Sequence, residues 1–370
     1  MVKVFYDGAI FYRQKHGGVS VVFREILKRI PKEIDIKCRC TFPSDNCPAD
    51  ISATVKAVVP RVRPSRFFPY IWNVANVLHC NVFKPDIFHS TFNTSVPGSR
   101  RLKTVFSVYD MIMERFPMEF SGNRWGDLVK LKERLARQAD VVLCISEATK
   151  RDVITLYPGI DERKVVSVYL AADEVFSTDI TVGEKGTFRE QNRLERQYLL
   201  YVGSVANPYK NFDLLLNVYA TSPEIHDRFD LVVVKPHGFT EHQSQIVSKL
   251  GTKIRAFSAL RTPELKALYN CARVFVYPSK YEGFGIPILE AMACGVPVLT
   301  ARSSSLPEVG GDAALYFDPD SSDDLRHNLL RLLDDDALRS GCLRKMVPNV
   351  ERFSWDKTAH EYAAIYRRLC

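Results

Sequence analysis

The chain has 370 residues, of which 46% are hydrophobic and 25% charged, and these proportions exclude a single small module and a disordered chain. The net charge is +8, and the whole surplus lies in residues 1–175, which hold 27 Lys and Arg against 19 Asp and Glu. No run reaches the ~18 apolar residues of a membrane-spanning helix, and Asp7 lies where a signal peptide would be apolar, so we expect a cytoplasmic protein.

Short runs rich in β-forming residues alternate with helical patterns through the first half of the chain. This alternation is typical of βαβ units around a parallel sheet. The predicted strands are Val2–Tyr6, Ile87–Phe88, Thr104–Val108, Val141–Ile145 and Val165–Tyr169, and the predicted helices are Val19–Ile30 and Arg134–Ala139.

The same alternation returns in the second half, after a stretch at about 175–196 in which apolar periodicity lapses. We interpret that stretch as a linker. The sequence therefore predicts an α/β protein of two Rossmann-like, doubly wound domains, residues 1–178 and 190–354, with the ligand site in the cleft between them. The predicted elements of the second half are Tyr198–Val202, Phe212–Tyr219, Leu231–Val234, Pro263–Cys271, Val274–Tyr277, a helix from near Pro287, Val296–Thr300 and a last helix, Trp355–Leu369.

Nine cysteines are scattered along the chain without a CxxC pair, and we expect them to be reduced thiols. A zinc site could be assembled from Cys38, Cys40, Cys47 and His79, but their spacing fits no common zinc pattern. We expect neither a metal nor a cofactor.

Residues 277–298 contain the most informative pattern of the sequence. A predicted strand ends in a loop with Gly283 and Gly285, a helix begins near Pro287, and Gly295 ends that helix. Free backbone N–H groups and the positive end of the helix dipole would make this helix start an anion site suited to a diphosphate.

Two carboxylates, Glu282 and Glu290, flank this predicted anion site. A carboxylate beside a phosphate would repel it, so hydroxyl groups are the expected partners. The combination indicates a nucleotide sugar. The alternative for Glu290 is a residue of the first helical turn that only the helix dipole stabilises.

The run from Glu282 to Val298 resembles the signature of the retaining glycosyltransferases of family 4, also called glycosyl transferases group 1, which have the GT-B fold. The resemblance implies that the last helix, residues 355–370, packs back on the first domain. Four further segments carry the resemblance: Gly17-Gly18-Val19, Ala139–Glu147, Tyr201–Ser204 continuing to Lys210-Asn211, and Phe353-Ser-Trp355.

This resemblance implies that Glu282 contacts the donor sugar near the reacting carbon, that Glu290 holds the ribose, and that Lys210 neutralises the diphosphate leaving group. Backbone amides of the Phe284–Ile286 segment would meet the sugar hydroxyls, and Lys235 with Ser258 would lie near the base. The donor residues implied in this way are Gly18, Gly203, Ser204, Asn211, Lys235, Ser258, Phe284, Gly285, Ile286, Pro287, Ile288 and Glu290.

The chain departs from the family pattern at two tyrosines. Tyr209 lies where the family often has Arg, and Tyr109, before Asp110, lies where many relatives have His. We place Tyr109 and Asp110 among the catalytic residues, with ordinary packing as the alternative for Tyr109. On the acceptor side the resemblance implies His89, Asn93, Ser146 and Glu147.

The expected reaction is transfer of a sugar from a nucleoside diphosphate sugar to a hydroxyl of a glycan or lipid-linked acceptor, with retention and without a metal. GDP-mannose or a related deoxyhexose donor is favoured over a UDP-sugar, on the resemblance to polysaccharide-building members. A nucleotide-sugar epimerase of the same fold is the alternative enzyme.

A basic patch with aromatic residues lies between Asp50 and Asp86, where the chain has no acidic residue. It could bind nucleic acid, but no recognition motif accompanies it, so we expect no nucleic-acid partner. An anionic acceptor or peripheral contact with an anionic membrane is the favoured interpretation. The patch consists of Lys56, Arg61, Arg63, Arg66, Phe67, Phe68, Tyr70, Trp72 and Lys84.

Overall fold

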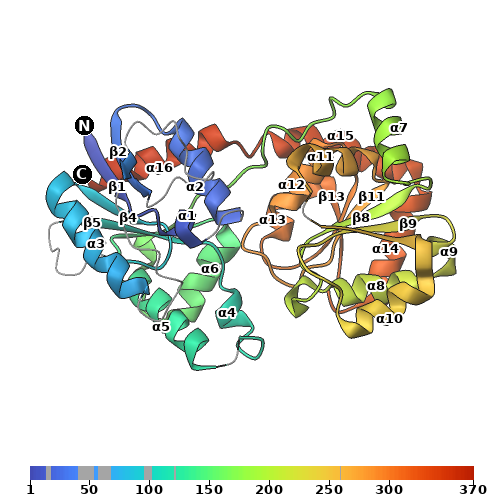
Figure 1. The fold of residues 1–370 in the computed structure, drawn as a ribbon, viewed down its shortest axis with the longest axis horizontal. Helices are drawn as coiled ribbons and strands as arrows, with labels where there is room; N and C mark the ends of the chain where they lie inside the picture. Colours follow the sequence, from blue (N-terminus) through green and yellow to red (C-terminus); the bar gives the residue numbers. More distant parts are fainter. Residues whose placement is uncertain (14–17, 41–53, 57–67, 96–101, 121, 259) are drawn as a thin grey trace. The chain divides into compact units, whose positions relative to one another are not determined.

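The chain forms two compact units, labelled element by element in Figure 1. Unit 1 comprises Met1–Leu170 and Ser354–Cys370, and unit 2 comprises Ala171–Phe353. The computed structural model describes residues 1–13, 18–40, 54–56, 68–95, 102–120, 122–258 and 260–370.

Unit 1 is built on a seven-stranded sheet in which every described strand pair is parallel. Its strands are β1 (Val2–Tyr6), β2 (Ile34–Cys40), β3 (Thr54–Lys56), β4 (Ile87–Ser90), β5 (Lys103–Val108), β6 (Val141–Cys144) and β7 (Val165–Ser167). Its helices are α1 (Ala9–Arg13), α2 (Gly18–Arg29), α3 (Phe68–Phe83), α4 (Ile112–Arg115), α5 (Asn123–Gln138), α6 (Glu147–Leu156), the short η1 (Glu162–Lys164) and α16 (Trp355–Leu369).

Unit 2 is built on a six-stranded parallel sheet. Its strands are β8 (Tyr198–Val202), β9 (Asp230–Val234), β10 (Ile254–Phe257), β11 (Val274–Tyr277), β12 (Val298–Ala301) and β13 (Ala314–Phe317). Its helices are α7 (Val182–Gln191), α8 (Phe212–Ala220), α9 (Pro223–His226), α10 (Glu241–Leu250), α11 (Thr262–Cys271), α12 (Ile286–Ala293), α13 (Leu306–Gly310), α14 (Ser322–Asp334) and α15 (Asp336–Val350), with the short η2 (Pro208–Lys210), η3 (Gly251–Lys253) and η4 (Gly311–Ala313).

Both sheets have the same doubly wound strand order, and this confirms the predicted fold class. The order is β3-β2-β1-β4-β5-β6-β7 in unit 1 and β10-β9-β8-β11-β12-β13 in unit 2. In unit 2, α8 packs on α10 and α14 on one face of the sheet, and α11 packs on α7 and α12 on the other (Figure 1). The strand order reverses between β1 and β4 and between β8 and β11, which are the positions where such sheets bind ligands.

The stretch interpreted from the sequence as a linker, 175–196, contains the helix α7. Thr181 and Glu184 form a capping box at its start. None of its residues is buried, so it has no apolar stripe by which periodicity could reveal it. Gly183 and Gly186 lie within this helix.

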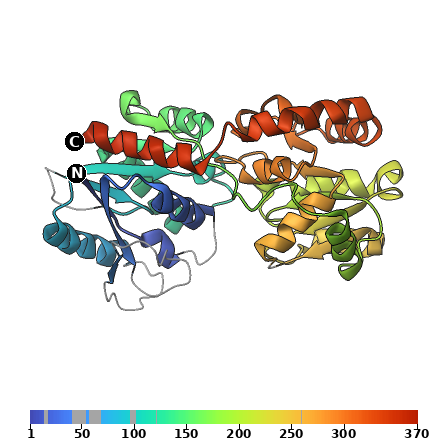
Figure 2. The same cartoon turned by 90° about the horizontal axis from the view of Figure 1, so that it is seen from above.

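Helix α16 belongs to unit 1 although it follows unit 2 in the chain, and Figures 1 and 2 show it against the elements of unit 1. It packs on α2 and β1. The hydroxyls of Tyr6 and Tyr366 hydrogen-bond with each other, and Thr358 Oγ1 donates to the carbonyl of Tyr169 at 2.6 Å.

His89, at the end of β4, completes the contact between the sheet of unit 1 and α16. It is fully buried, with Nδ1 2.6 Å from the Tyr366 hydroxyl and Nε2 2.8 Å from Ser107 Oγ. Burial lowers the pKa of its imidazole to about 3, so the ring is neutral. Both ring nitrogens of His89, which the sequence analysis assigned to an acceptor hydroxyl, thus have partners within the core.

Replacing Tyr366 by Phe tests this network. Tyr366→Phe leaves His89 Nδ1 and the Tyr6 hydroxyl without that buried partner, so the free energy of unfolding should fall by about 1–3 kcal/mol. Tyr362→Phe on the same helix is the matched control, because the Tyr362 hydroxyl hydrogen-bonds to neither Tyr6 nor His89. Denaturant unfolding of both variants is the measurement, and equal losses would contradict the assigned role of Tyr366.

Candidate functional site

Lys210 and Glu282, which lie 72 positions apart in the chain, form an ion pair in unit 2. The Nζ atom of Lys210 donates to Oε1 of Glu282 at 2.7 Å and to Oε2 at 2.9 Å. Lys210 ends η2, which follows β8, and Glu282 follows β11, the neighbouring strand. The strand reversal between β8 and β11 thus brings together Lys210 and Glu282, two of the four residues that the sequence analysis placed among the catalytic residues.

Aromatic rings flank the ammonium group of Lys210. Its Nζ lies 5.6 Å from the ring centre of Tyr209 and 5.8 Å from that of Tyr277, both within the range of cation–π attraction. Tyr209, which lies where the family often has Arg, therefore supplies no second cation. Its ring instead attracts the ammonium group of Lys210.

Three consecutive serines after β12 hold the loop that carries Glu282. Ser304 Oγ accepts from the Glu282 amide at 2.9 Å. Ser305 Oγ lies 2.9 Å from the carbonyl of Glu282 and 2.7 Å from that of Phe284, and Ser303 Oγ donates to the Ser279 carbonyl at 2.8 Å. The loop is thus fixed through its backbone, and the Glu282 side chain remains available to Lys210 and a ligand.

Gly285 turns the chain from this loop into α12. Its φ of +110° is one that other residues rarely adopt, and an added Cβ would lie 3.0 Å from Leu306 Cδ2. Pro287, in the first turn, has no N–H to lose. The helix start is consequently fixed in position, and the Ile288 amide of its first turn donates to the Gly285 carbonyl at 3.0 Å.

Glu290 lies in the second turn of α12, not the first as predicted, because the helix begins at Ile286. The helix dipole acts mainly within the first turn, so it does not account for a glutamate here. Tyr269 of α11 donates a hydrogen bond of 2.9 Å to Glu290 Oε2. Burial raises the pKa of the Glu290 carboxyl to about 7, and the Tyr269 hydrogen bond opposes that rise.

The other predicted donor residues of unit 2 follow strands that end at the same edge of the sheet. Gly203 and Ser204 follow β8, Lys235 follows β9 and Ser258 follows β10, where Ser258 is exposed. Lys235 Nζ donates to the His237 carbonyl at 2.8 Å.

Asn211 has a structural role in the loop after η2. It adopts a left-handed conformation, with a φ of +56°, and its Nδ2 donates to the carbonyls of Pro278 at 3.2 Å and Pro319 at 2.8 Å. Its amide therefore ties the loops after β8, β11 and β13 together, and it is this amide group that the sequence assigned to the donor.

In unit 1 the predicted site residues also lie at strand ends, but most of their side chains make hydrogen bonds or ring contacts within the unit. Ser146, assigned from the sequence to the acceptor side, is fully buried and caps α6, since its Oγ accepts from the Thr149 amide at 2.9 Å. Glu147 accepts a hydrogen bond from Ser167. Asp110 Oδ1 accepts from the Ile112 amide at 3.1 Å, and the ring of Tyr109 lies 6.1 Å from that of Phe23.

The remaining predicted residues of unit 1 are less enclosed. Asn93 follows β4, is half-buried and has a φ of +45°. Gly18 begins α2 and is exposed, while Gly17 lies outside the described residues.

Sequence reasoning did not predict the structural role of Asp7. It follows β1, is fully buried, and accepts hydrogen bonds from the Thr91 amide at 2.9 Å and from the hydroxyls of Thr91 and Thr94. The carboxylate thus joins the ends of β1 and β4, where the strand order of unit 1 reverses. In the sequence, the signal for this contact was the threonines of the His89–Thr94 segment, which lies at the end of a neighbouring strand.

Among the described residues, no group of three or more His, Cys, Asp or Glu side chains is arranged to hold a metal ion. Cys47, one member of the zinc set considered from the sequence, lies outside the described residues. His79 Nδ1 lies 2.7 Å from the Ala75 carbonyl, and its ring stacks on Phe5.

A double-mutant cycle measures the Lys210–Glu282 pair. The side chains are only 17% and 10% exposed, so Lys210→Gln leaves a largely buried carboxylate without its cation. We expect each single change, Lys210→Gln or Glu282→Gln, to lower the unfolding free energy by about 3 kcal/mol, near the lower end of the range for breaking a buried pair. The double variant should lose less than the sum. Additive losses in denaturant unfolding would contradict the pairing.

Two family models match the chain and together span most of it. The model described as glycosyl transferases group 1 matches residues 184–346, and the model described as Glycosyltransferase Family 4 matches residues 16–175.

Curated relatives and solved structures agree with the family models. The O-antigen chain mannosyltransferase B of Escherichia coli is 30% identical over 78% of this chain and 75% of its own length. The serotype-specific mannosyltransferase WbdA of Escherichia coli is 30% identical over 78% of this chain but only 36% of its own length.

The structure of HepE from Anabaena in complex with UDP and glucose has a TM-score of 0.78 at 16% identity and 100% coverage of both chains. WaaG, a glycosyltransferase involved in lipopolysaccharide biosynthesis, has a TM-score of 0.76 at 17% identity and 99% coverage of both chains. The chain belongs to glycosyltransferase family 4 and has the GT-B fold.

Proposed function

We propose that this glycosyltransferase transfers a sugar from a nucleoside diphosphate sugar to a hydroxyl of a glycan or lipid-linked acceptor, with retention at the anomeric carbon and without a metal ion. The observation that carries the proposal is the Lys210–Glu282 pair where the strand order of unit 2 reverses, beside the start of α12.

Lys210 is the residue that would stabilise the leaving diphosphate. An ammonium group has three hydrogen-bond donors, and the two oxygens of Glu282 account for two of them. The third donor can meet a phosphate oxygen while the contact with Glu282 holds Lys210 in place. A cation fixed before the reaction needs no reorganisation when charge develops on the leaving group.

Glu282 is the residue that would bind the sugar. A carboxylate has about four lone-pair sites; Lys210 occupies two and Tyr277 also hydrogen-bonds to Glu282, so a remaining site can accept a hydrogen bond from a sugar hydroxyl. The adjoining backbone N–H groups at the start of α12 complement the phosphate charge. One loop therefore offers acceptors to hydroxyls and donors to phosphate, as a nucleotide sugar requires.

The contacts of the two glutamates support a retaining reaction without an enzymic nucleophile. Lys210 holds Glu282 through both oxygens, and Glu290 accepts from Tyr269. We propose that the leaving phosphate takes the acceptor proton on the face of the sugar from which it departs. An Asp-x-Asp pattern, Asp318-Pro-Asp320, follows β13, but Asp320 pairs with Lys280 and Asp318 accepts from the Asp320 amide. The proposal therefore assigns the phosphate charge to Lys210 and backbone amides.

The mannosyltransferases among the relatives support GDP-mannose or a related deoxyhexose as the donor. Several of these relatives are mannosyltransferases, and two from Escherichia coli are 30% identical to this chain. The UDP-bound neighbour is only 16% identical and supports the fold alone.

Release of nucleoside diphosphate from a panel of donor sugars tests both the donor preference and the metal independence of the reaction. We expect release from GDP-mannose to exceed release from UDP-sugars and to persist in EDTA. Lys210→Gln should lower turnover by about 10²- to 10³-fold, the cost of losing one preorganised stabilising group. Lys280→Gln, which alters an exposed lysine in the loop after β11, is the matched control and should keep most of the activity.

Loss of activity in EDTA that added metal restores would contradict the metal-independent mechanism. Equal losses in Lys210→Gln and Lys280→Gln would contradict the role of Lys210. Circular dichroism at the assay temperature shows whether each variant is folded.

We further propose that unit 1 makes peripheral contact with an anionic membrane. Three apolar side chains at four-residue spacing on α3, Val74, Leu78 and Val82, are 62%, 61% and 87% exposed. The three arginines of the basic patch and Phe67 lie outside the described residues, and Trp72, assigned to the patch from the sequence, is buried and donates to the Asp7 carbonyl at 3.2 Å. Among the described residues, no helix combines the length and apolarity needed to cross a membrane.

Sedimentation with phosphatidylglycerol vesicles at low salt tests this contact. Changing Leu78 and Val82 to Asp should weaken vesicle binding by about tenfold for each side chain, since burying one is worth about 1.5 kcal/mol or more. Val347→Asp alters a valine of unit 2 that is 65% exposed and serves as the control. Unchanged sedimentation of the α3 variant would contradict the proposed surface.

A further inference from the structure

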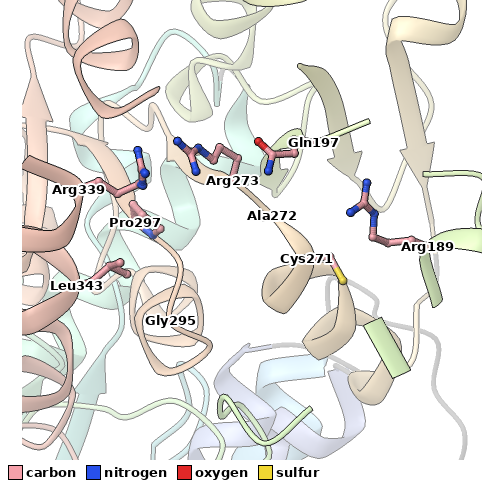
Figure 3. A pocket seen from close by; sticks show the side chains of 9 residues that line it. All are labelled: Arg189, Gln197, Cys271, Ala272, Arg273, Gly295, Pro297, Arg339 and Leu343. Carbon is pink, nitrogen blue, oxygen red and sulfur yellow. The ribbon is translucent and has the colours of Figure 1, made fainter. Parts of the chain in front are cut away.

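Unit 2 has a pocket of about 210 Å³ at the amino ends of its central strands (Figure 3). Gln197 directly precedes β8, Arg273 precedes β11 and Pro297 precedes β12. Because these strands are parallel and Lys210 and Glu282 follow their carboxyl ends, the pocket and the ion pair lie at opposite edges of one sheet.

The lining of this pocket is basic. Arg189 of α7, Arg273 and Arg339 of α15 contribute to it, and none of its nine lining residues is acidic. Figure 3 shows the guanidinium groups of Arg273 and Arg339 beside one another, with the Gln197 carboxamide near Arg273. These groups are hydrogen-bond donors of the kind that bind oxyanions.

Arg273 and Arg339 are close enough to repel each other. Burial, and then the charge of Arg339, lower the pKa of the Arg273 guanidinium below its usual value. The Nε atom of Arg273 is also buried and hydrogen-bonds to nothing within the described part of the chain. An unsatisfied buried donor beside a like charge is costly, and a bound anion would relieve both costs.

Backbone carbonyl groups hold Arg189 and Arg273 in place. Arg189 donates to the carbonyls of Leu194 at 3.0 Å and Glu195 at 2.9 Å, and Arg273 Nη2 donates to that of Leu333 at 3.2 Å.

The acidic neighbour of these arginines is Asp336, which pairs with Arg339 and lies 3.8 Å from Arg273. Its side chain is 82% exposed, so water screens its charge. Each guanidinium has five N–H donors, and these contacts leave several unused.

We propose that this arginine pocket binds a phosphate group, as a site separate from that of the donor nucleotide. A volume of about 210 Å³ is below the range of about 300–1,000 Å³ typical of larger organic ligands, and it suits a tetrahedral dianion or the phosphate end of a small metabolite. The bidentate donors of the arginines match phosphate oxygens.

The pocket adjoins the far ends of the two helices that hold Glu290. Helix α12 begins at Ile286 beside the Glu282 loop, and Gly295, just beyond its other end, lines the pocket. Helix α11 carries Tyr269, the partner of Glu290, and ends at Cys271, which also lines the pocket. A bound phosphate would therefore contact the segments that connect this edge of the sheet to the candidate donor site.

Calorimetric titration of the full chain with inorganic phosphate, at ionic strength held constant with sodium chloride, tests the site. We expect Arg339→Gln and Arg273→Gln to weaken phosphate binding by about 10- to 100-fold, as expected for losing hydrogen bonds to a charged group. Arg339→Lys, which keeps the charge but loses the planar fork, should weaken it less. Arg344→Gln, an exposed arginine of α15 outside the pocket, is the matched control and should bind as the unchanged protein does.

Lys210→Gln separates this site from the candidate donor site, because phosphate binding should persist when Lys210 is lost. A second titration with glycerol 3-phosphate distinguishes the source of the ligand: tighter binding than inorganic phosphate assigns the pocket to a phosphomonoester, and weaker binding assigns it to the free ion. No binding of either probe, or binding that Lys210→Gln abolishes and Arg339→Gln leaves unchanged, would overturn the proposal. A failure of sugar transfer would leave this result unaffected, since the titration contains no donor.

Discussion

The parallel pairing of β8 with β11 is the constraint on which the candidate site depends. These strands are distant in sequence but adjacent in the sheet, and the chain leaves their carboxyl ends in loops that lead to α8 and α12 on opposite faces. Lys210 and Glu282 lie in those loops and meet in a direct ion pair. A charge and its counter-charge are thus held together by the topology of the sheet rather than by neighbouring positions in the chain.

The surrounding contacts fix this pair before any substrate arrives. The serines after β12 hold the backbone around Glu282, Gly285 allows the turn into α12, and Asn211 ties the Lys210 loop to its neighbours. Because the pair is nearly neutral, attraction of a diphosphate depends on the N–H groups at the start of α12 and on the spare donor of Lys210. Such preorganisation favours stabilisation of a developing charge over tight binding of the free nucleotide.

The sequence predicted the fold from local patterns, and it named Lys210 and Glu282 by resemblance to the family without predicting that they pair. The strands Val2–Tyr6, Tyr198–Val202 and Val274–Tyr277 have the predicted bounds, and the motif around Glu282 has its own strand, loop and helix signals. Other features leave no local signal. The partners of His89 and Ser146, which are Tyr366 and Thr149, emerge only from tertiary packing and helix capping. Helix α7 was missed because it is largely exposed and has no apolar stripe. The arginine pocket is lined by residues scattered between 189 and 343, so no local sequence pattern predicts it.

A crystal structure of the full chain with bound GDP-mannose would test the account most directly. The account predicts a diphosphate oxygen within about 3 Å of Lys210 Nζ, and a sugar hydroxyl donating to Glu282. The nucleotide should lie at the carboxyl ends of β8 and β11, with its phosphates at the start of α12. A nucleotide bound elsewhere, or one that leaves Lys210 in contact with Glu282 alone, would contradict the assignment of this pair to the chemistry.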